Sequence, residues 1–263
     1  MLHNGGSSHA IWKEVANRLA GKYEIFALDL LGGFGNSAKP GAGYTLDNYV
    51  AMLEEFVSSR GLEKVALVGN CMGCAISLAF TERHQDKVKA LVLCNPLTES
   101  TFLGGWLGPF LWIRERLPAI NRQVYRLLGQ LKLTNGIGSA ATLFQLGAAR
   151  PSPQAPAQPP RTRRQLHGHW PAGVAARSAR RPGELLGHRQ PRAAAGLPSH
   201  LHHLGGLKNK IVSPKAGRRL NSTLHPARQE WLPESGHLLM LEQPDEVASI
   251  IDGFLQAAAA THA

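Results

Sequence analysis

Short apolar runs alternate with amphipathic segments along most of this 263-residue chain. Runs rich in leucine and β-branched residues predict buried strands, whereas apolar residues at three- and four-residue spacing predict helices. Thr45 and Asp47 are both candidate caps for the second predicted helix. Strands that alternate with helices predict an α/β fold with a doubly wound, mostly parallel sheet. The predicted strands cover 23–28, 65–68, 88–94 and 227–232, and the predicted helices cover 10–19, 44–60, 75–80 and 245–258.

The stretch Gly69-Asn70-Cys71-Met72-Gly73 lies between a predicted strand and a predicted helix. A nucleophile at the apex of such a strand–turn–helix forms a strained nucleophile elbow, in which the apex residue has an unfavourable backbone conformation. Side chains at Gly69 or Gly73 would collide across the turn. The thiol of Cys71 would lie at a helix N-terminus, where the helix dipole favours the thiolate. The alternative is a buried structural cysteine in an ordinary turn.

The chain has three cysteines, Cys71, Cys74 and Cys94, which are too few for a disulfide framework. This number fits a reducing compartment. Because the sequence also contains no run of 18 apolar residues and no basic, apolar leader, we expect a cytoplasmic protein. The spacing of Cys71 and Cys74 is compatible with redox chemistry. The elbow glycines favour another role for Cys74, that of a small residue which lets the helix pack on the strand.

Most of the formal net charge of +11 comes from one segment. Residues 145–204 contain nine Arg, no Lys and one acidic residue, whereas the other 203 residues carry 20 basic and 17 acidic side chains. This distribution argues against nucleic-acid binding by the folded body. The segment itself lacks periodicity and could be a basic linker that binds RNA or anionic lipid. We favour the hypothesis of a GC-rich sequence read out of frame, because His203-Leu204-Gly205 shifted by one base can encode Thr-Trp-Gly.

Aromatic and leucine residues lie among glycine and arginine over 97–144. They predict the helices of a lid, with a membrane-surface patch as the alternative. The predicted domain organisation is a core over 1–96, a lid insertion over 97–204 and the rest of the core over 205–263. Within the insertion, 150–203 is predicted to be disordered or out of frame, because it has too little apolar surface to offset chain entropy.

Four ordered sequence blocks resemble those of the α/β-hydrolase superfamily, specifically its lidded branch. In chain order, the first block resembles the family's oxyanion loop and the second its Asp-x-x-Gly-x-Gly-x-Ser loop. The third resembles the nucleophile elbow, with Cys as in dienelactone hydrolases, and the fourth resembles the catalytic-histidine block. The resemblance covers roughly residues 1–100 and 205–263. The family has one or two strands before the oxyanion loop, and their absence here would expose part of the sheet. The four blocks are residues 3–6, 29–37, 69–73 and 233–244.

The resemblance implies a site built on Cys71 and His237. Cys71 would attack an acyl carbonyl, and His237 would take or share its proton and later protonate the leaving group. The backbone N–H groups of Met72 and Gly5 would form the oxyanion hole. His3 is more often a structural loop residue than a catalyst in such a position.

The third member of the triad departs from the family pattern. The family acid usually stands in a Gly-x-x-Asp sequence, which here reads Gly206-Leu207-Lys208-Asn209. Asn209 could still orient the histidine, as the asparagine does in Cys-His-Asn proteases. The alternative acid position follows the preceding strand, where Glu99 is the candidate.

These residues predict a cofactor-independent hydrolase that acts on a small acyl substrate, namely a carboxylic ester, thioester or lactone. No His or Cys pair has ligand spacing in a structured stretch, so we expect no metal site. Epoxide hydrolase and haloalkane dehalogenase chemistry is excluded, since both would require Asp in place of Cys71. The alternative function is that of a catalytically inactive or binding-only relative.

Overall fold

The computed structural model describes residues 1–31, 44–98, 100–101, 104–105 and 200–260. Its centre is a sheet of four parallel strands in the order β1-β2-β3-β4. Parallel neighbours need crossover connections, and α3 (Met72–Arg83) provides one between β1 and β2, as α8 (Pro214–Leu224) does between β3 and β4. The strands are β1 (Val65–Asn70), β2 (Val88–Cys94), β3 (Leu201–Gly206) and β4 (Arg228–Leu232).

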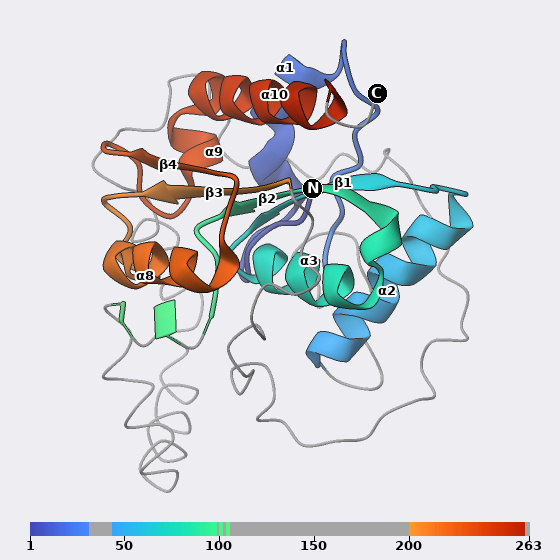
Figure 1. The fold of residues 1–263 in the computed structure, drawn as a ribbon, viewed down its shortest axis with the longest axis horizontal. Coiled ribbons are helices and arrows are strands. Elements are labelled where there is room, and N and C mark those ends of the chain that lie inside the picture. The colour runs from blue at the N-terminus through green and yellow to red at the C-terminus, as the bar shows by residue number, and fades with distance from the viewer. Residues whose placement is uncertain (32–43, 99, 102–103, 106–199, 261–263) are drawn as a thin grey trace, which may run out of the picture.

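Helices cover both faces of this sheet (Figure 1). Each face buries its own apolar cluster, one beneath α2 and α3 and the other beneath α1 and α10. The predicted α/β fold with a parallel sheet is therefore confirmed. On one face lie η1 (His9–Trp12), α1 (Lys13–Leu19), α9 (Leu239–Glu242) and α10 (Pro244–Ala260), and on the other α2 (Leu46–Ser59), α3 and α8, while the short η2 (Gln85–Lys87) leads into β2.

Most predicted elements are present, with ends shifted by a few residues. α2 begins after Thr45, whose Oγ1 accepts a hydrogen bond from Asn48 N at 3.2 Å, so Thr45 rather than Asp47 is the cap. β2 has the predicted bounds, and β1 continues two residues further than predicted, to Asn70.

The strand predicted over 23–28 is wrong over most of its length. Only Leu28 forms a bridge there, a parallel one with Leu2. Leu2 also forms a parallel bridge with Gly69 of β1, so the first residues of the chain lie between residues 26–28 and β1. A strand needs a hydrogen-bonded neighbour, and among the described residues only Met1 and Leu2 supply one for this segment.

The start of β3 corrects the predicted lid boundary. Residues 201–204, assigned to the lid, form the first part of β3, pair with β2 and β4 and are fully buried. Burial between two parallel strands and two helical layers orders a sequence that has no apolar periodicity of its own. Residues 106–199 and Glu99 lie outside the described residues. The lid helices and the out-of-frame hypothesis therefore stay predictions.

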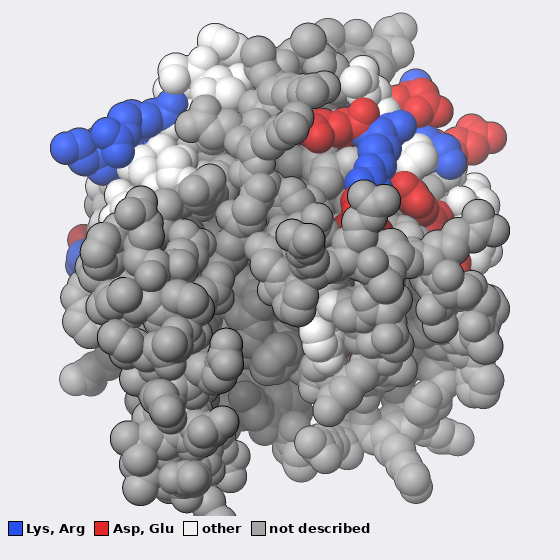
Figure 2. All heavy atoms as spheres, turned by 90° about the horizontal axis from the view of Figure 1, so that it is seen from below, with Lys and Arg blue, Asp and Glu red and all other residues white. Residues whose placement is uncertain are grey.

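Acidic and basic side chains of the described residues are mixed on the surface. Figure 2 shows both signs side by side at one corner of the face it presents. Arg18 contacts both Glu14 and Asp245, and Lys22 contacts Asp252. Within the described ranges, no helix is both long and apolar enough to span a bilayer.

Candidate active site

Cys71 stands at the sharp turn between β1 and α3. Its backbone has φ 52° and ψ −106°, in the region that side chains rarely occupy. A Cβ on Gly69 would lie 2.5 Å from the carbonyl carbon of Gly73, and a Cβ on Gly73 would lie 2.4 Å from Leu2 O. Both glycines are thus needed, the first for closure of the turn and the second for the approach of residues 1–3. The strained elbow predicted at this position is present.

The thiol of Cys71 does not have the predicted thiolate character. Its side chain is buried, and burial raises the pKa of the thiol to about 12. The backbone N–H of Met72, at the start of α3, lowers the pKa but is the weaker effect. Desolvation therefore outweighs the helix terminus, and Cys71 is a protonated thiol at neutral pH.

Cys74 packs in the way predicted for a small residue between helix and strand. Its thiol donates to Gly69 O at 3.1 Å and to Cys94 O at 3.2 Å, and the side chain is fully buried. All three cysteines are free. The carbonyl contacts of Cys74 explain its burial without any redox role.

The predicted oxyanion loop is held against the elbow. A Cβ on Gly5 would lie 3.8 Å from Met72 Sδ, so the Met72 side chain packs against the segment that carries Gly5. His3 Nε2 accepts a hydrogen bond from Leu30 N at 2.9 Å, and its Nδ1 therefore donates to Asn4 O at 2.7 Å. Burial lowers the pKa of His3. His3 is a structural residue of the loop, as expected.

The loop that carries His237 is fixed by a residue on a neighbouring strand end. Asn95, directly after β2, donates through Nδ2 to Gly236 O at 3.1 Å and to His237 O at 3.2 Å. Its Oδ1 accepts from Gly206 N at 3.0 Å. On the other side, the N–H of Gly236 donates to both carboxylate oxygens of Glu242, with N···O distances of 3.1 and 3.0 Å. Asn95 thus ties the ends of β2 and β3 to the histidine loop.

Sequence reasoning missed the roles of Asn95 and Glu242. Asn95 has φ 51°, a conformation that asparagine tolerates better than most residues. An asparagine between a buried strand and a proline was therefore a usable signal. Glu242 lies inside the histidine block but has no feature in the sequence that distinguishes it from a surface acid.

The imidazole of His237 is buried and incompletely hydrogen-bonded. Its Nδ1 has no hydrogen-bond partner, and burial lowers the pKa of the ring to about 3. His237 is therefore neutral at pH 7. Cys71 and His237 are both at the carboxyl edge of the sheet, because Asn95 joins the His237 loop to the end of β2 and Cys71 N donates to Cys94 O. Within the part of the chain described, no hydrogen bond joins the two side chains.

Asn209 is buried beside the same loop. Lys208 N donates to Ser235 O at 2.9 Å, which brings the segment after β3 against the histidine block. The Oδ1 of Asn209 accepts from Ile211 N at 2.9 Å and from Val212 N at 3.1 Å, while its Nδ2 has no partner. The structure therefore places an unpartnered amide nitrogen and an unpartnered imidazole nitrogen on adjoining segments, without a hydrogen bond between them.

A sequence profile of the alpha/beta hydrolase fold matches residues 1–244. The chain belongs to this family of hydrolytic enzymes. Over 97% of its length it is 26% identical to the 2-hydroxy-6-oxo-6-(2'-aminophenyl)hexa-2,4-dienoic acid hydrolase of Metapseudomonas resinovorans, with 82% of that protein covered. It is also 26% identical, over 98% of its length and 86% of the relative, to the 2-hydroxymuconate semialdehyde hydrolase of Pseudomonas sp. CF600.

A similar fold is present in the naproxen esterase of Bacillus subtilis. The TM-score is 0.67 at 20% sequence identity, with 97% of this chain and 81% of the esterase covered. At this identity the similarity concerns the fold alone.

Proposed function

We propose that this chain hydrolyses a carboxylic ester, thioester or lactone, with Cys71 as nucleophile and His237 as general base. The observation that carries the proposal is the backbone strain at Cys71, because a buried structural cysteine needs no left-handed conformation. The adjoining Met72 and Gly5 segments offer the backbone donors for an oxyanion. Three free thiols agree with a reducing compartment, and we extend the proposal to the cytoplasm.

The ionisation states favour proton transfer during attack over a preformed ion pair. Nε2 of His237 accepts the thiol proton while Cys71 Sγ bonds to the acyl carbon and the carbonyl electron pair moves onto oxygen. The resulting oxyanion accepts hydrogen bonds from Met72 N–H and Gly5 N–H. It collapses to an acyl-thioester, and the leaving group takes the proton from His237. Water, deprotonated by His237, then releases the acid.

Asn209 decides which imidazole nitrogen carries the proton. The two N–H groups of Ile211 and Val212 fix Oδ1, since a flipped amide would direct NH₂ at two donors. Nδ2 is therefore the atom available to His237. A donor at this position favours an unprotonated Nδ1, which places the proton on Nε2 in most molecules, so that only the minor tautomer offers Nε2 as the base. On this basis we expect slow turnover.

The same observation favours a second candidate function, that of a binding-only relative without turnover. It differs from the first in one testable respect, whether Cys71 is acylated. The names of the two curated relatives refer to hydrolases of unsaturated oxo acids. We therefore include a 2-hydroxy-6-oxo-dienoic acid beside esters and thioesters as test compounds.

The deciding experiment is mass spectrometry of the intact chain after incubation with p-nitrophenyl acetate or an acyl thioester. The proposal expects a single acetyl group on the peptide that contains Cys71, with release of p-nitrophenol. Cys71→Ala removes both signals, whereas the matched variant Cys74→Ala keeps most of them. Equal loss with Cys74→Ala would support redox chemistry instead. A folded parent with neither an acyl adduct nor release of p-nitrophenol above the uncatalysed rate would leave only the binding function.

A further inference from the structure

The stretch from Leu207 to Arg228 departs from the mixed charges of the rest of the surface. It contains six basic residues and no acidic one. The other described residues carry 8 Lys and Arg against 15 Asp and Glu, so the positive charge of the described part is gathered in this one stretch. The six basic residues are Lys208, Lys210, Lys215, Arg218, Arg219 and Arg228.

Three of these residues form one exposed face of α8, which we call the basic face. Lys215, Arg218 and Arg219 stand at three- and four-residue spacing, and all three are exposed. No carboxylate of the described residues forms an ion pair with them. The opposite face of the helix is buried and consists of Ala216, Gly217, Leu220 and Leu224.

The stability of α8 does not explain the basic face. Lys215 is in the first turn of the helix, where the positive end of the helix dipole disfavours a cation. Lys215 and Arg219 are four residues apart, a spacing at which like charges destabilise a helix. These side chains therefore weaken the helix that carries them, which indicates that they serve a partner with negative charge.

An exposed leucine lies on a segment that adjoins the basic face. Arg218 is placed over Trp231 of β4, with its guanidinium carbon 5.1 Å from the ring centre. Leu207 N donates to Leu232 O, directly after Trp231, at 3.0 Å. Leu207 is 38% exposed and Tyr44 is 40% exposed, and among the described residues these are the two large apolar side chains on the surface.

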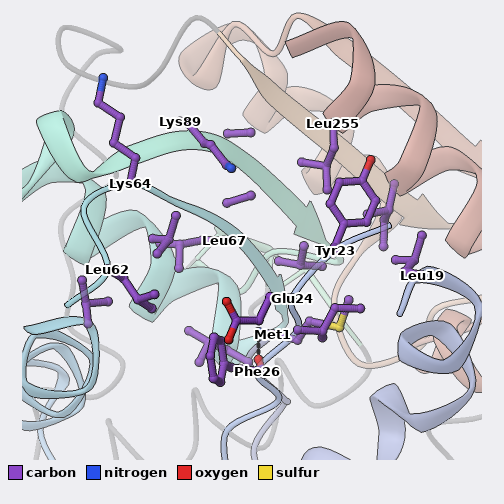
Figure 3. A pocket seen from close by; sticks show the side chains of 18 of the residues that line it. Met1, Leu19, Tyr23, Glu24, Phe26, Leu62, Lys64, Leu67, Lys89 and Leu255 are labelled. Carbon is purple, nitrogen blue, oxygen red and sulfur yellow. Dashed lines mark hydrogen bonds between the residues drawn. The ribbon is translucent and has the colours of Figure 1, made fainter. Parts of the chain in front are cut away.

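The basic face has no pocket that would hold a small anion. The cavity beside α8 measures about 10 Å³ and lies under the buried side of the helix, at Gly217 and Trp231. A cavity of about 650 Å³ lies at the other end of the sheet, between residues 23–26 and β1, with Lys64 and Lys89 at its edge (Figure 3). A convex helix face with exposed cations fits an extended anionic surface.

Two observations favour a bilayer over a nucleic acid as that surface. The described residues outside Leu207 to Arg228 are net negative and would repel a polyanion that follows the chain around, whereas a planar surface meets one face alone. Arg218 covers the ring of Trp231, so this ring is not open to a stacking base. Leu207 adds an apolar side chain that suits the boundary of headgroups and acyl chains.

We propose that α8 attaches the chain to the surface of an anionic bilayer. Lys215, Arg218 and Arg219 lie at the phosphate headgroups, and Leu207 enters the interface beside them. Each Lys or Arg close to such a surface strengthens binding by about fivefold. The attraction extends over about 10 Å at about 0.1 M salt. The surface does not include Cys71 or His237, so it stands or falls apart from the hydrolase.

The test is co-sedimentation of the 263-residue chain with vesicles of phosphatidylcholine and phosphatidylglycerol. Lys215→Glu/Arg219→Glu should weaken binding at least ~20-fold at about 0.1 M salt. Both positions are exposed and an acidic residue favours the first helical turn, so the variant keeps α8 folded. Lys215→Arg/Arg219→Lys should bind as the parent does.

The matched control is Lys64→Glu/Lys89→Glu, which changes the net charge equally at the far end of the sheet (Figure 3). It should weaken binding less than ~3-fold. Equal weakening in the two double variants overturns the proposal, because net charge alone, including the nine arginines of residues 145–204, would then account for the binding.

Two further measurements test the lipid contact itself. Leu207→Ser should weaken vesicle binding several-fold, whereas Tyr44→Ser should not, since α2 and α8 lie at opposite ends of one face of the sheet (Figure 1). An equal effect of the two variants overturns the proposed orientation. If Lys215→Glu/Arg219→Glu weakens binding to a single-stranded RNA and leaves vesicle binding unchanged, the proposal is overturned in favour of nucleic acid.

Discussion

At the scale of single residues, the proposed chemistry depends on one side-chain atom of Asn209. Its Oδ1 is held by two backbone donors and its Nδ2 has no partner, while Nδ1 of His237 has none either. An aspartate would offer the same backbone contacts with one oxygen and an acceptor with the other. The amide can offer only a donor at that second point.

Asn209→Asp should therefore raise the pKa of His237 and increase acyl turnover by ~10–100-fold, because a carboxylate holds the proton on Nδ1 and frees Nε2 as base. The pH–rate profile is the measurement. The parent should show no acidic limb near pH 6, since the pKa of His237 is about 3, and the variant should gain one at higher pH. Asn209→Ala is the control and should lower any activity through lost orientation. If both variants match an active parent, Asn209 is not the third member of the triad.

Two adjacent histidines of β3 show how a hydrogen-bond partner affects the contribution of a buried imidazole to stability. Both are buried. His202 packs against Phe254 of α10, both of its ring nitrogens lack hydrogen-bond partners, and Glu230 Oε1 is 3.7 Å from its Nε2. His203 points to the opposite face, where Nδ1 contacts Asn221 Oδ1 at 2.5 Å and the ring packs on Trp231.

We expect His202→Ile to stabilise the fold by ~1–2 kcal/mol and His203→Ile to destabilise it by a similar amount. The first substitution removes two unsatisfied buried nitrogens, whereas the second leaves Oδ1 of Asn221 without the ring nitrogen as its partner. Urea unfolding of the two variants beside the parent measures the difference. A destabilised His202→Ile would mean that its ring nitrogens are satisfied in solution.

At the scale of elements, α3 and α10 differ in how closely other backbone segments approach their glycines. Gly73 in the first turn of α3 has no room for a Cβ beside Leu2, whereas Gly253 of α10 has no atom within 4 Å of one. The same residue type in two helices is thus required in one and replaceable in the other.

Gly73→Ala should destabilise the chain by ~2–4 kcal/mol and displace residues 1–3, because the new Cβ would meet backbone atoms of Leu2. Gly253→Ala should stabilise it by ~0.5–1 kcal/mol through helix propensity alone. Thermal unfolding of both variants provides the comparison. A neutral Gly73→Ala would show that the first residues move away from β1 at little cost.

At the scale of the whole molecule, buried histidines link folding to pH. Burial lowers the pKa of His202 to about 4 and that of His237 to about 3, and it lowers the pKa values of His3 and His203 as well. As pH falls below 6.5, the unfolded chain binds protons that the folded chain does not. The stability is therefore complete above pH 6.5 and is lost as the pH falls toward 4.

His202 and His237 should each remove ~1.4 kcal/mol of unfolding free energy per pH unit over this window, and His3 and His203 should act in the same direction. The urea midpoint should decline progressively from pH 7.5 to 6 and 5. His202→Ile should reduce the dependence of the unfolding free energy on pH by the contribution of one titrating proton. A midpoint that stays constant down to pH 5 would contradict the burial of these rings in solution.

The sequence by itself determined the parallel α/β fold, most helices and strands, and the positions of Cys71 and His237. Local patterns suffice there, since apolar runs, caps and glycines around the elbow act over a few neighbouring residues. Thr45 and Gly69 have the roles that their sequence context predicted, whereas Gly73 makes room for Leu2 and not for closure of the turn.

Only the tertiary structure decided the remaining features, because each depends on segments far apart in the chain. β3 is ordered by β2 and β4 although its Leu-His-His-Leu-Gly-Gly sequence has no strand pattern. The segment 23–28 is mostly apolar, but among the described residues its backbone pairs only with Met1 and Leu2, and it is not a regular strand. Burial reverses the expected ionisation of Cys71, and two N–H donors fix the amide of Asn209. Pairing, desolvation and hydrogen-bond direction are set by neighbours in space, which a residue's own sequence context does not contain.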